Sequence, residues 1–365
     1  MTVFNLFFLI YVFSLFFTKA VSQEIKINNE FKITKIGDTI NHPWGMSLID
    51  NKSVIVTSKK GLIYLINLDT YKLELIHKVD QTKDYNQGGL LDILSVKNNN
   101  LIEIFICFLN KSDNDLLISK YQLNNKKLLN KKIIFKSNYE SKSGKHFGCR
   151  LVDYKKTILA TLGDRGQRKN SQNPRNYPGS IIQLSYEGKK LGFKRNNWKS
   201  GIYSIGHRNP QGLIYIKEFD EVWSHEHGPK GGDEINIIKK GSNYGWPIVT
   251  FGKEYWGGPI GEGFSKRGMI DPIWKWVPSI APSGIDFYKH DYFSELKDTL
   301  LIGSLKFKSL YAVRLKNNKP TSEFVVFKNK IGRIRDVMTH PNGYILMLND
   351  EYEGGLYKLT KSLIN

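Results

Sequence analysis

A loosely repeated unit of short apolar strands is the feature that most restricts how this chain can fold. Each unit holds three or four runs rich in Ile, Val, Leu, Tyr and Phe, separated by turns rich in Gly, Asn, Asp and Lys. Helical periodicity is nearly absent, and this pattern predicts an all-β chain. The units start roughly 45 to 75 residues apart, at Pro43, Gly88, Gly148, Gln211, Ser283 and Arg335.

Six such units predict a six-bladed β-propeller with four-stranded antiparallel blades. A pair of β-sandwiches and a β-solenoid are the alternatives, although a single sandwich would not need so many copies. Irregularity of the repeats also leaves seven blades open. With 365 residues the chain has ample core, and we assign residues 23–365 to one propeller domain.

The first residues predict a secretory signal. Residues 1–17 are strongly apolar, and the small residues Ala20 and Ser22 fit a cleavage site. We therefore assign residues 1–22 to a signal peptide and expect a periplasmic or secreted protein, without stable membrane insertion after cleavage. Because no Lys or Arg precedes the apolar run, an uncleaved anchor is the alternative.

The charge and the cysteines exclude some classes of protein. Although 54 Lys and Arg against 34 Asp and Glu give a net charge of +20, the lysines are scattered, often beside asparagine, so we expect no nucleic-acid partner. Cys107 and Cys149 are too few for a disulfide framework and lack metal-ligand spacing. Whether they pair is left open.

The segment from Ser204 to Pro247 carries most of the polar chemistry. Two predicted strands, Leu213–Ile216 and Val222–Ser224, place its polar clusters on loops at strand ends. Glycine and proline in His227-Gly228-Pro229 present carbonyl oxygens, which suit calcium. An ordinary surface turn is the alternative, and the neighbouring Glu234, Asn243 and Tyr244 favour the metal.

A propeller brings loops that are distant in sequence around one pocket. Four cations at unit starts or ends would then face one cavity: Arg208, Lys306, Arg333 and Arg335. They would repel each other unless an anion lay among them, and arginine binds carboxylates or phosphates bidentately. The pattern therefore indicates a ligand with several anionic groups.

Taken together, nine motifs resemble the soluble sugar dehydrogenases that depend on pyrroloquinoline quinone (PQQ), most closely the aldose sugar dehydrogenase branch of the glucose/sorbosone dehydrogenase fold. They are HPWGMSL, QGGLLDI, HFGCRLV, TLGDRG, GHRNPQG, EHGPKGGDEINIIKKGSNYGWP, PSIAPSGIDFY, GSLK and GRIRDV, spread between about Pro43 and Leu359. The resemblance implies a six-bladed propeller that holds PQQ and calcium in its central pocket.

The resemblance also implies roles for individual residues. His146 would be the general base, with Asp164 as its acidic partner, and Arg208 would complete the catalytic set. The cofactor-binding residues would be Gln87, His146, Arg208, Asn209, Tyr255, Lys306, Arg333 and Arg335. The carbonyls of Gly228 and Pro229 would bind the cofactor's calcium, and Glu234 with the backbone of Tyr244 would bind a second calcium.

The implied activity is oxidation of an aldose at C1 to its lactone, with hydride transfer to PQQ and electrons passed to an external acceptor, by a monomer or homodimer. The alternatives are a calcium-dependent propeller lactonase and a non-catalytic sugar-binding propeller. Residues 167–172 are more basic than the family pattern, which puts contacts there in doubt. Five aromatic residues could stack on sugar rings or lie between blades: Trp246, Tyr255, Trp256, Trp274 and Trp276.

Overall fold

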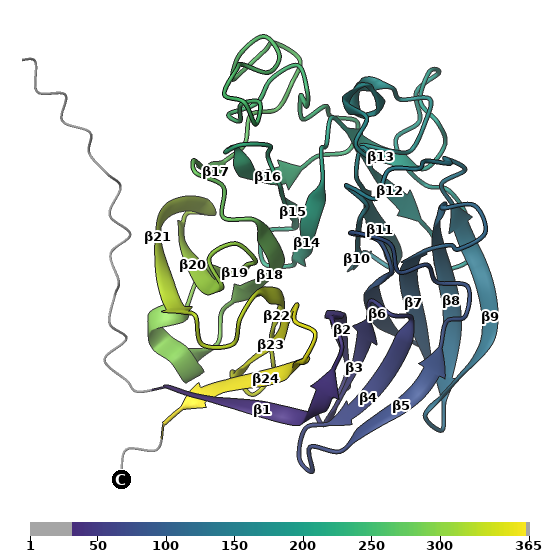
Figure 1. The fold of residues 1–365 in the computed structure, drawn as a ribbon, viewed down its shortest axis with the longest axis vertical. Coiled ribbons are helices and arrows are strands. Elements are labelled where there is room, and N and C mark those ends of the chain that lie inside the picture. Colours follow the sequence, from purple (N-terminus) through teal and green to yellow (C-terminus); the bar gives the residue numbers. More distant parts are fainter. Residues whose placement is uncertain (1–30, 363–365) are drawn as a thin grey trace, which may run out of the picture.

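Six four-stranded antiparallel sheets form a ring in the computed structural model, which describes residues 31–362 (Figure 1). The first three sheets contain β2 (Pro43–Asp50), β3 (Ser53–Ser58), β4 (Leu62–Asn67) and β5 (Leu73–Lys78); β6 (Leu90–Asn98), β7 (Leu101–Leu109), β8 (Leu116–Asn124) and β9 (Lys127–Lys136); and β10 (Gly148–Tyr154), β11 (Thr157–Leu162), β12 (Ser180–Leu184) and β13 (Ile202–Ile205). The predicted six-bladed β-propeller is thereby confirmed.

The other three sheets complete the ring. They contain β14 (Pro210–Ile216), β15 (Glu221–Glu226), β16 (Asp233–Ile238) and β17 (Trp274–Trp276); β18 (Pro282–Tyr288), β19 (Thr299–Ser304), β20 (Ser309–Lys316) and β21 (Lys319–Lys328); and β22 (Ile334–Thr339), β23 (Ile345–Asn349), β24 (Gly354–Lys361) and β1 (Phe31–Ile40). Two short 3₁₀ helices cover Arg168–Gln172 and Asp291–Leu296.

The ring is closed by strand β1, which comes from the opposite end of the chain to the rest of its blade. It pairs antiparallel with β24, from Phe31 opposite Lys361 to Ile40 opposite Gly354. This pairing ties the two ends of the ring together, which removes the open gap that the first and last blades would otherwise leave.

Apolar side chains between neighbouring blades form the core. Six buried clusters lie between the six pairs of adjacent sheets. Strand β7 shows how one strand serves two of them, since Ile104 and Ile106 pack toward the preceding blade and Phe105 and Cys107 toward the next. Successive side chains of a strand point to opposite faces, so a strand buried on both faces needs the unbroken apolar run seen here.

Every innermost strand has a register shift near its first residues. The shift recurs at equivalent positions in β2, β6, β10, β14, β18 and β22. An extra residue of this kind bends a strand and redirects side chains. Four of the residues within these shifts, Trp44, Leu91, Gln211 and Arg335, line the cavity described below.

A buried guanidinium lies beneath that cavity. Arg150 Nη1 lies 3.2 Å from Asp92 Oδ1 and 2.9 Å from Asp336 Oδ1, and all three side chains are nearly inaccessible. Burial raises the pKa of Asp92, and it raises that of Asp336 to about 7 although Arg150 opposes the shift. The three groups form the polar centre of the ring.

Cys107 and Cys149 form a disulfide, which answers the question that the sequence left open. Their Cα atoms are 5.8 Å apart, and the bond joins β7 of the second blade to β10 of the third. Both side chains are fully buried. The bond therefore fixes the start of β10, three residues after His146.

Within residues 31–362 no helix is long and apolar enough to cross a membrane. The predicted signal peptide, residues 1–22, lies outside the residues that the structure describes.

We expect loss of the disulfide to destabilise the fold. The bond spans 42 residues of sequence, a loop for which chain-entropy arguments give about 4 kcal/mol, or a drop of roughly 5 °C or more in the thermal unfolding midpoint. The variants Cys107→Ala, Cys149→Ala and the double variant should lose nearly equal stability, because removing either partner breaks the same bond. Additive losses in the double variant would show that packing, rather than the cross-link, sets the effect.

Candidate active site

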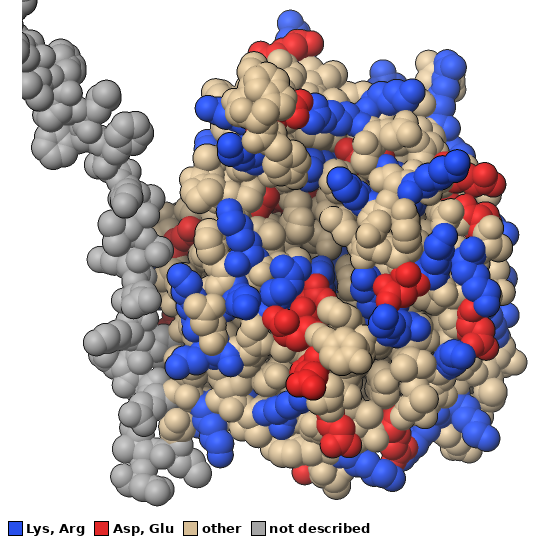
Figure 2. Space-filling view, in the orientation of Figure 1, with Lys and Arg blue, Asp and Glu red and all other residues tan. Residues whose placement is uncertain are grey.

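A cavity of about 700 Å³ opens at the end of the channel where the innermost strands begin. Figure 2 shows this face, with Lys and Arg side chains gathered beside the hollow near the middle of the ring. All six blades contribute to the lining, in chain order through His42 and Trp44, Gln87 and Leu91, Phe147 and Gly148, Asn209 and Gln211, Lys306, and Arg333 with Arg335. Loops distant in sequence therefore meet around one pocket.

Five of the predicted cofactor-binding residues line this cavity together. They are Gln87, Asn209, Lys306, Arg333 and Arg335. Gln211 Oε1 accepts from Arg335 Nη1 at 3.3 Å, and Gln211 Nε2 donates to Asn209 Oδ1 at 3.1 Å. Gln211 thus joins the fourth and sixth blades across the cavity floor.

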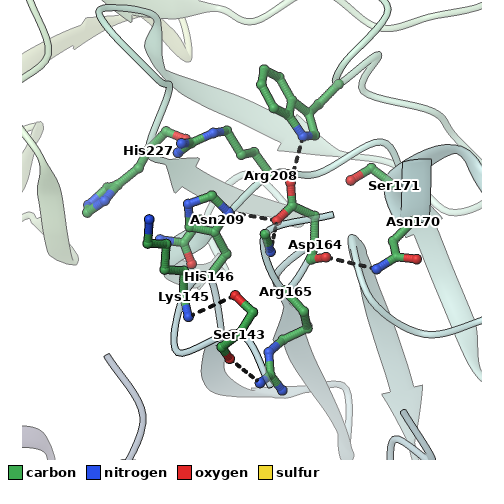
Figure 3. Close-up of polar contacts among 12 residues, drawn as sticks. Ser143, Lys145, His146, Asp164, Arg165, Asn170, Ser171, Arg208, Asn209 and His227 are labelled. Atoms are coloured by element: carbon green, nitrogen blue, oxygen red, sulfur yellow. Dashed lines mark hydrogen bonds and ion pairs between the residues drawn. The ribbon is translucent and has the colours of Figure 1, made fainter. Parts of the chain in front are cut away.

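His146 and Asp164 lie beside the cavity and face each other (Figure 3). His146 Nδ1 is 2.7 Å from Asp164 Oδ1, and Gln87 Oε1 accepts from the backbone N–H of His146 at 2.8 Å. Burial lowers the pKa of His146, and the hydrogen bond to Asp164 offsets that shift only in part. With Nδ1–H donated to a carboxylate, the lone pair of Nε2 is available as a proton acceptor.

Glu226 holds the backbone of the Arg208–Asn209 pair. One carboxylate oxygen accepts from both N–H groups of the pair, and the other lies 3.0 Å from His207 Nδ1. Here the sequence interpretation was wrong in one respect: the strand predicted to end at Ser224 continues as β15 through His225 and Glu226, which are buried rather than on a loop. A buried carboxylate such as that of Glu226 is tolerated in a packed core because its oxygens have hydrogen-bond partners.

The residues predicted to bind calcium come from two neighbouring loops and strand β16. The Gly228 carbonyl accepts from Arg208 Nη1 at 2.9 Å, so a cationic group already contacts one predicted ligand. Glu234 and Tyr244 both border a small buried space together with Glu226. Burial, reinforced by Glu226, raises the pKa of Glu234 to about 8. Residues 31–362 contain no group of three His, Cys, Asp or Glu side chains arranged to hold a metal.

An aspartate that sequence reasoning missed lies among the cavity cations. Asp350 is 2.5 Å from Arg335 Nη2, 3.4 Å from Arg333 Nη2 and 2.9 Å from His42 Nδ1. Burial opposes its ionisation, but Arg335 and the other partners outweigh burial and hold the pKa of Asp350 well below its usual range. The protein itself therefore supplies one of the negative charges that the converging cations require. Its position directly after strand β23, at a strand end facing the cavity, was the available signal.

Tyr255 lies outside the cavity lining and is 71% exposed, so the structure does not bring it to the other predicted residues. The basic segment after Asp164 contributes Arg168, whose guanidinium forms two hydrogen bonds to Glu254 at 2.6 and 2.8 Å. Trp276 is buried between blades and donates to Glu323, whereas Trp256 is 81% exposed. Of the five aromatic residues, only Tyr255 and Trp256 are exposed.

The chain is similar to sugar dehydrogenases along most of its length. A family model described as Glucose / Sorbosone dehydrogenase matches residues 40–358. Aldose sugar dehydrogenase YliI of Escherichia coli (strain K12) is 32% identical over 337 residues, covering 88% of this chain and 91% of that protein. Quinoprotein glucose dehydrogenase B of Acinetobacter calcoaceticus is 25% identical over 437 residues, covering 94% and 90%.

A crystal structure of the soluble aldose sugar dehydrogenase from Escherichia coli in the apo-form matches with a TM-score of 0.85 and 30% identity. The match covers 91% of this chain and all of that one. The resemblance drawn from the nine sequence motifs is confirmed.

We expect Asp350→Asn to destabilise the protein in a pH-dependent way. The substitution leaves Arg333, Arg335 and His42 without their shared carboxylate, at a cost of roughly 2–4 kcal/mol at pH 7. Because the folded-state pKa of Asp350 is depressed, its stabilisation is present above the unfolded-state value near 4 and is lost as pH falls through the folded-state value. Denaturant unfolding from pH 3 to 8 measures this difference between variant and parent.

Asp291→Asn is the control, because Asp291 pairs with Lys297 at an exposed site, where solvent screens the pair and its loss should change stability little. A loss at Asp350 that is equally large at pH 3 and pH 7 would contradict the assigned ion pairs.

Proposed function

This chain belongs to the glucose/sorbosone dehydrogenase family, and on that premise we propose that it is a quinoprotein that oxidises aldose sugars at C1 to the lactone and passes the electrons to an external acceptor. The observation that carries the proposal is the His146–Asp164 pair beside a cavity lined by cations. When bound, PQQ with calcium supplies a two-electron acceptor for the hydride from C1, polarised by the metal as a Lewis acid.

The cavity residues fit a cofactor with several carboxylates. Arg335 Nε in the cavity lining and Arg208 Nε beside the cavity are buried without a hydrogen-bond partner among residues 31–362. Lys306 lines the cavity and forms no ion pair with any residue between 31 and 362. Guanidinium and ammonium N–H donors that lack acceptors are suited to carboxylates. We therefore propose that PQQ is held by Lys306, Arg333 and Arg335 at its carboxylates, with Gln87, Arg208 and Asn209 as further contacts; Tyr255, outside the cavity lining, is not among them.

His146 is proposed to take the proton of the anomeric hydroxyl at Nε2. Burial keeps its pKa below the ordinary value, so the imidazole is neutral at neutral pH. Asp164 fixes the tautomer with the proton on Nδ1 and stabilises the imidazolium that forms as the proton is transferred. Arg208, the third proposed catalytic residue, is held next to this pair, since its carbonyl accepts from the Asp164 N–H at 2.8 Å.

Calcium is proposed at two places, the carbonyls of Gly228 and Pro229 and the oxygens of Glu234 and Tyr244. The support at the second place is the buried Glu234 carboxyl close to Glu226, since a divalent cation there would offset two neighbouring carboxylates. At the first place Arg208 would have to share or leave the Gly228 carbonyl.

We also propose export from the cytoplasm, consistent with a periplasmic or secreted enzyme. The buried Cys107–Cys149 disulfide supports this, because such bonds form and persist in oxidising compartments.

The proposal is tested by reconstituting the purified protein with PQQ and Ca²⁺ and assaying dye reduction with several aldoses. Sugar-dependent dye reduction that needs both PQQ and Ca²⁺ is the expected result. Lactone hydrolysis without quinone would instead identify a lactonase, and sugar binding without either reaction would identify a binding protein.

We expect Arg333→Ala and Arg335→Ala each to weaken PQQ binding by roughly 1.5 to 3 kcal/mol, the range for hydrogen bonds to charged groups. Arg335 should give the larger loss because its side chain is 10% exposed against 40% for Arg333. Titration calorimetry measures the affinity. Arg314→Ala, which removes a guanidinium of strand β20 that is outside the cavity lining, is the control, and unchanged affinity in both cavity variants would rule out the anion pocket.

We expect His146→Gln to leave the fold and PQQ affinity nearly unchanged while kcat falls by roughly 100-fold or more, the usual contribution of a positioned general base. Steady-state kinetics on the quinone-loaded protein provide the measurement. His340→Gln is the control, since His340 stacks on Tyr344 and bonds Asn51 O. Near-normal kcat in His146→Gln would refute the assignment, and an equal loss of PQQ binding would make His146 a cofactor ligand.

A further inference from the structure

Trp246 contacts both groups that flank the proposed base. Its indole Nε1 donates to Asp164 Oδ2 at 2.8 Å, and the Arg208 guanidinium carbon lies 5.3 Å from its ring centroid. Its side chain is buried, so it offers no open face to a sugar. We propose that Trp246 is a positioning residue for His146, acting through Asp164; this inference rests on the proposed function of His146.

The Asp164 carboxylate is fully buried, and each of its oxygens has a distinct task. Oδ1 accepts from His146 Nδ1 and from the Gly166 N–H, both at 2.7 Å. Oδ2 accepts from Trp246 alone among the side chains and backbone groups of residues 31–362. Without the indole N–H, Oδ2 would be buried with no hydrogen bond. This is costly, and rotation of the carboxylate would relieve the cost. The indole therefore keeps Oδ1 facing the imidazole.

Hydrogen bonds to the third blade hold the backbone of Trp246 at both its N–H and its carbonyl. Its backbone N–H donates to Gly206 O at 3.0 Å, and its carbonyl accepts from Gln172 Nε2 at 2.7 Å. Gln172 also exchanges two hydrogen bonds with Asn243. The long connection between β16 and β17 thereby returns to the third blade and delivers the indole to Asp164.

The indole N–H also adjusts the basicity of His146. It draws negative charge of Asp164 toward Oδ2, so less is available to stabilise a protonated imidazole. Removing it should raise the pKa of His146, which leaves a smaller neutral fraction to accept a proton near pH 6. Arg208 and Lys145, the other charged groups that act on His146, lower its pKa and remain in place in the variant. The acid limb of the kcat/KM profile, which follows the free enzyme, should then move to higher pH.

Trp246→Phe removes the N–H and keeps an aromatic ring. Trp276→Phe is the matched control, because Trp276 is equally buried and donates to the carboxylate of Glu323 at 2.5 Å in another part of the fold. The first measurement is the NMR titration of the histidine imidazoles in protein without quinone or sugar. We expect the pKa of His146 to rise by about 0.5 to 1 unit in Trp246→Phe and to stay unchanged in Trp276→Phe.

The second measurement is the pH profile of the reconstituted enzyme. We expect the acid limb of Trp246→Phe to move up by the same amount, so that kcat/KM falls by roughly 3- to 10-fold at pH values below the parent's His146 pKa, with unchanged PQQ affinity. An unchanged His146 titration in Trp246→Phe, or an equal shift in Trp276→Phe, overturns the inference. Because the titration needs no cofactor, it stays readable even if the dehydrogenase proposal fails.

If Trp246→Phe does not fold, the parent protein still provides a test. One of the seven indole N–H resonances should then shift with pH at the midpoint of His146, since the two groups share one carboxylate. The absence of any indole shift at that midpoint overturns the inference.

Discussion

The guanidinium of Arg150 is the contact on which the centre of the ring depends, because it joins five of the six blades. It starts from β10 and contacts Asp92 of β6, Asp336 and the Arg335 carbonyl of β22, the Gln211 carbonyl of β14 and the ring face of Trp44 in β2. The apolar clusters hold each blade only to its neighbours and are not directional. The buried ion pairs and carbonyl bonds therefore supply the directional contacts that fix the inner strands relative to one another.

The same contacts place the floor of the candidate active site. Arg150 bonds the backbone of Gln211 and Arg335, whose side chains line the cavity and bond each other. Both residues lie within the register shifts at the starts of their strands. The register shift that recurs in all six innermost strands thus turns side chains into the channel. Arg150 holds two of the shifted segments, those of Gln211 and Arg335, in place. Packing at the ring's centre and the geometry of the site are therefore not separable.

The fold and much of the site could be predicted because both leave local signals. Apolar runs at regular spacing marked the blades, and cations at unit starts marked Arg333 and Arg335 as cavity residues. Asp350 and Trp246 were missed or misread because their partners are remote: Asp350 needs His42 from the other end of the chain, and Trp246 needs Asp164 from another blade. Trp246 was considered for sugar stacking, whereas its ring is buried. The assignment of Glu226 to a loop failed because its bonds to the Arg208–Asn209 backbone make a buried carboxylate acceptable within a strand.

By itself, the sequence determined the six repeated strand units, the order of the motifs and the residue types that face the channel, because alternation and turn residues act over a few positions. Only the tertiary structure decided that Cys107 and Cys149 pair, that β1 closes the last blade, that Asp350 lies among the cavity cations and that Tyr255 lies outside the cavity lining. The physical reason is that each of these features depends on how strands and loops come together when the blades pair and the ring closes, which patterns over a few positions do not specify.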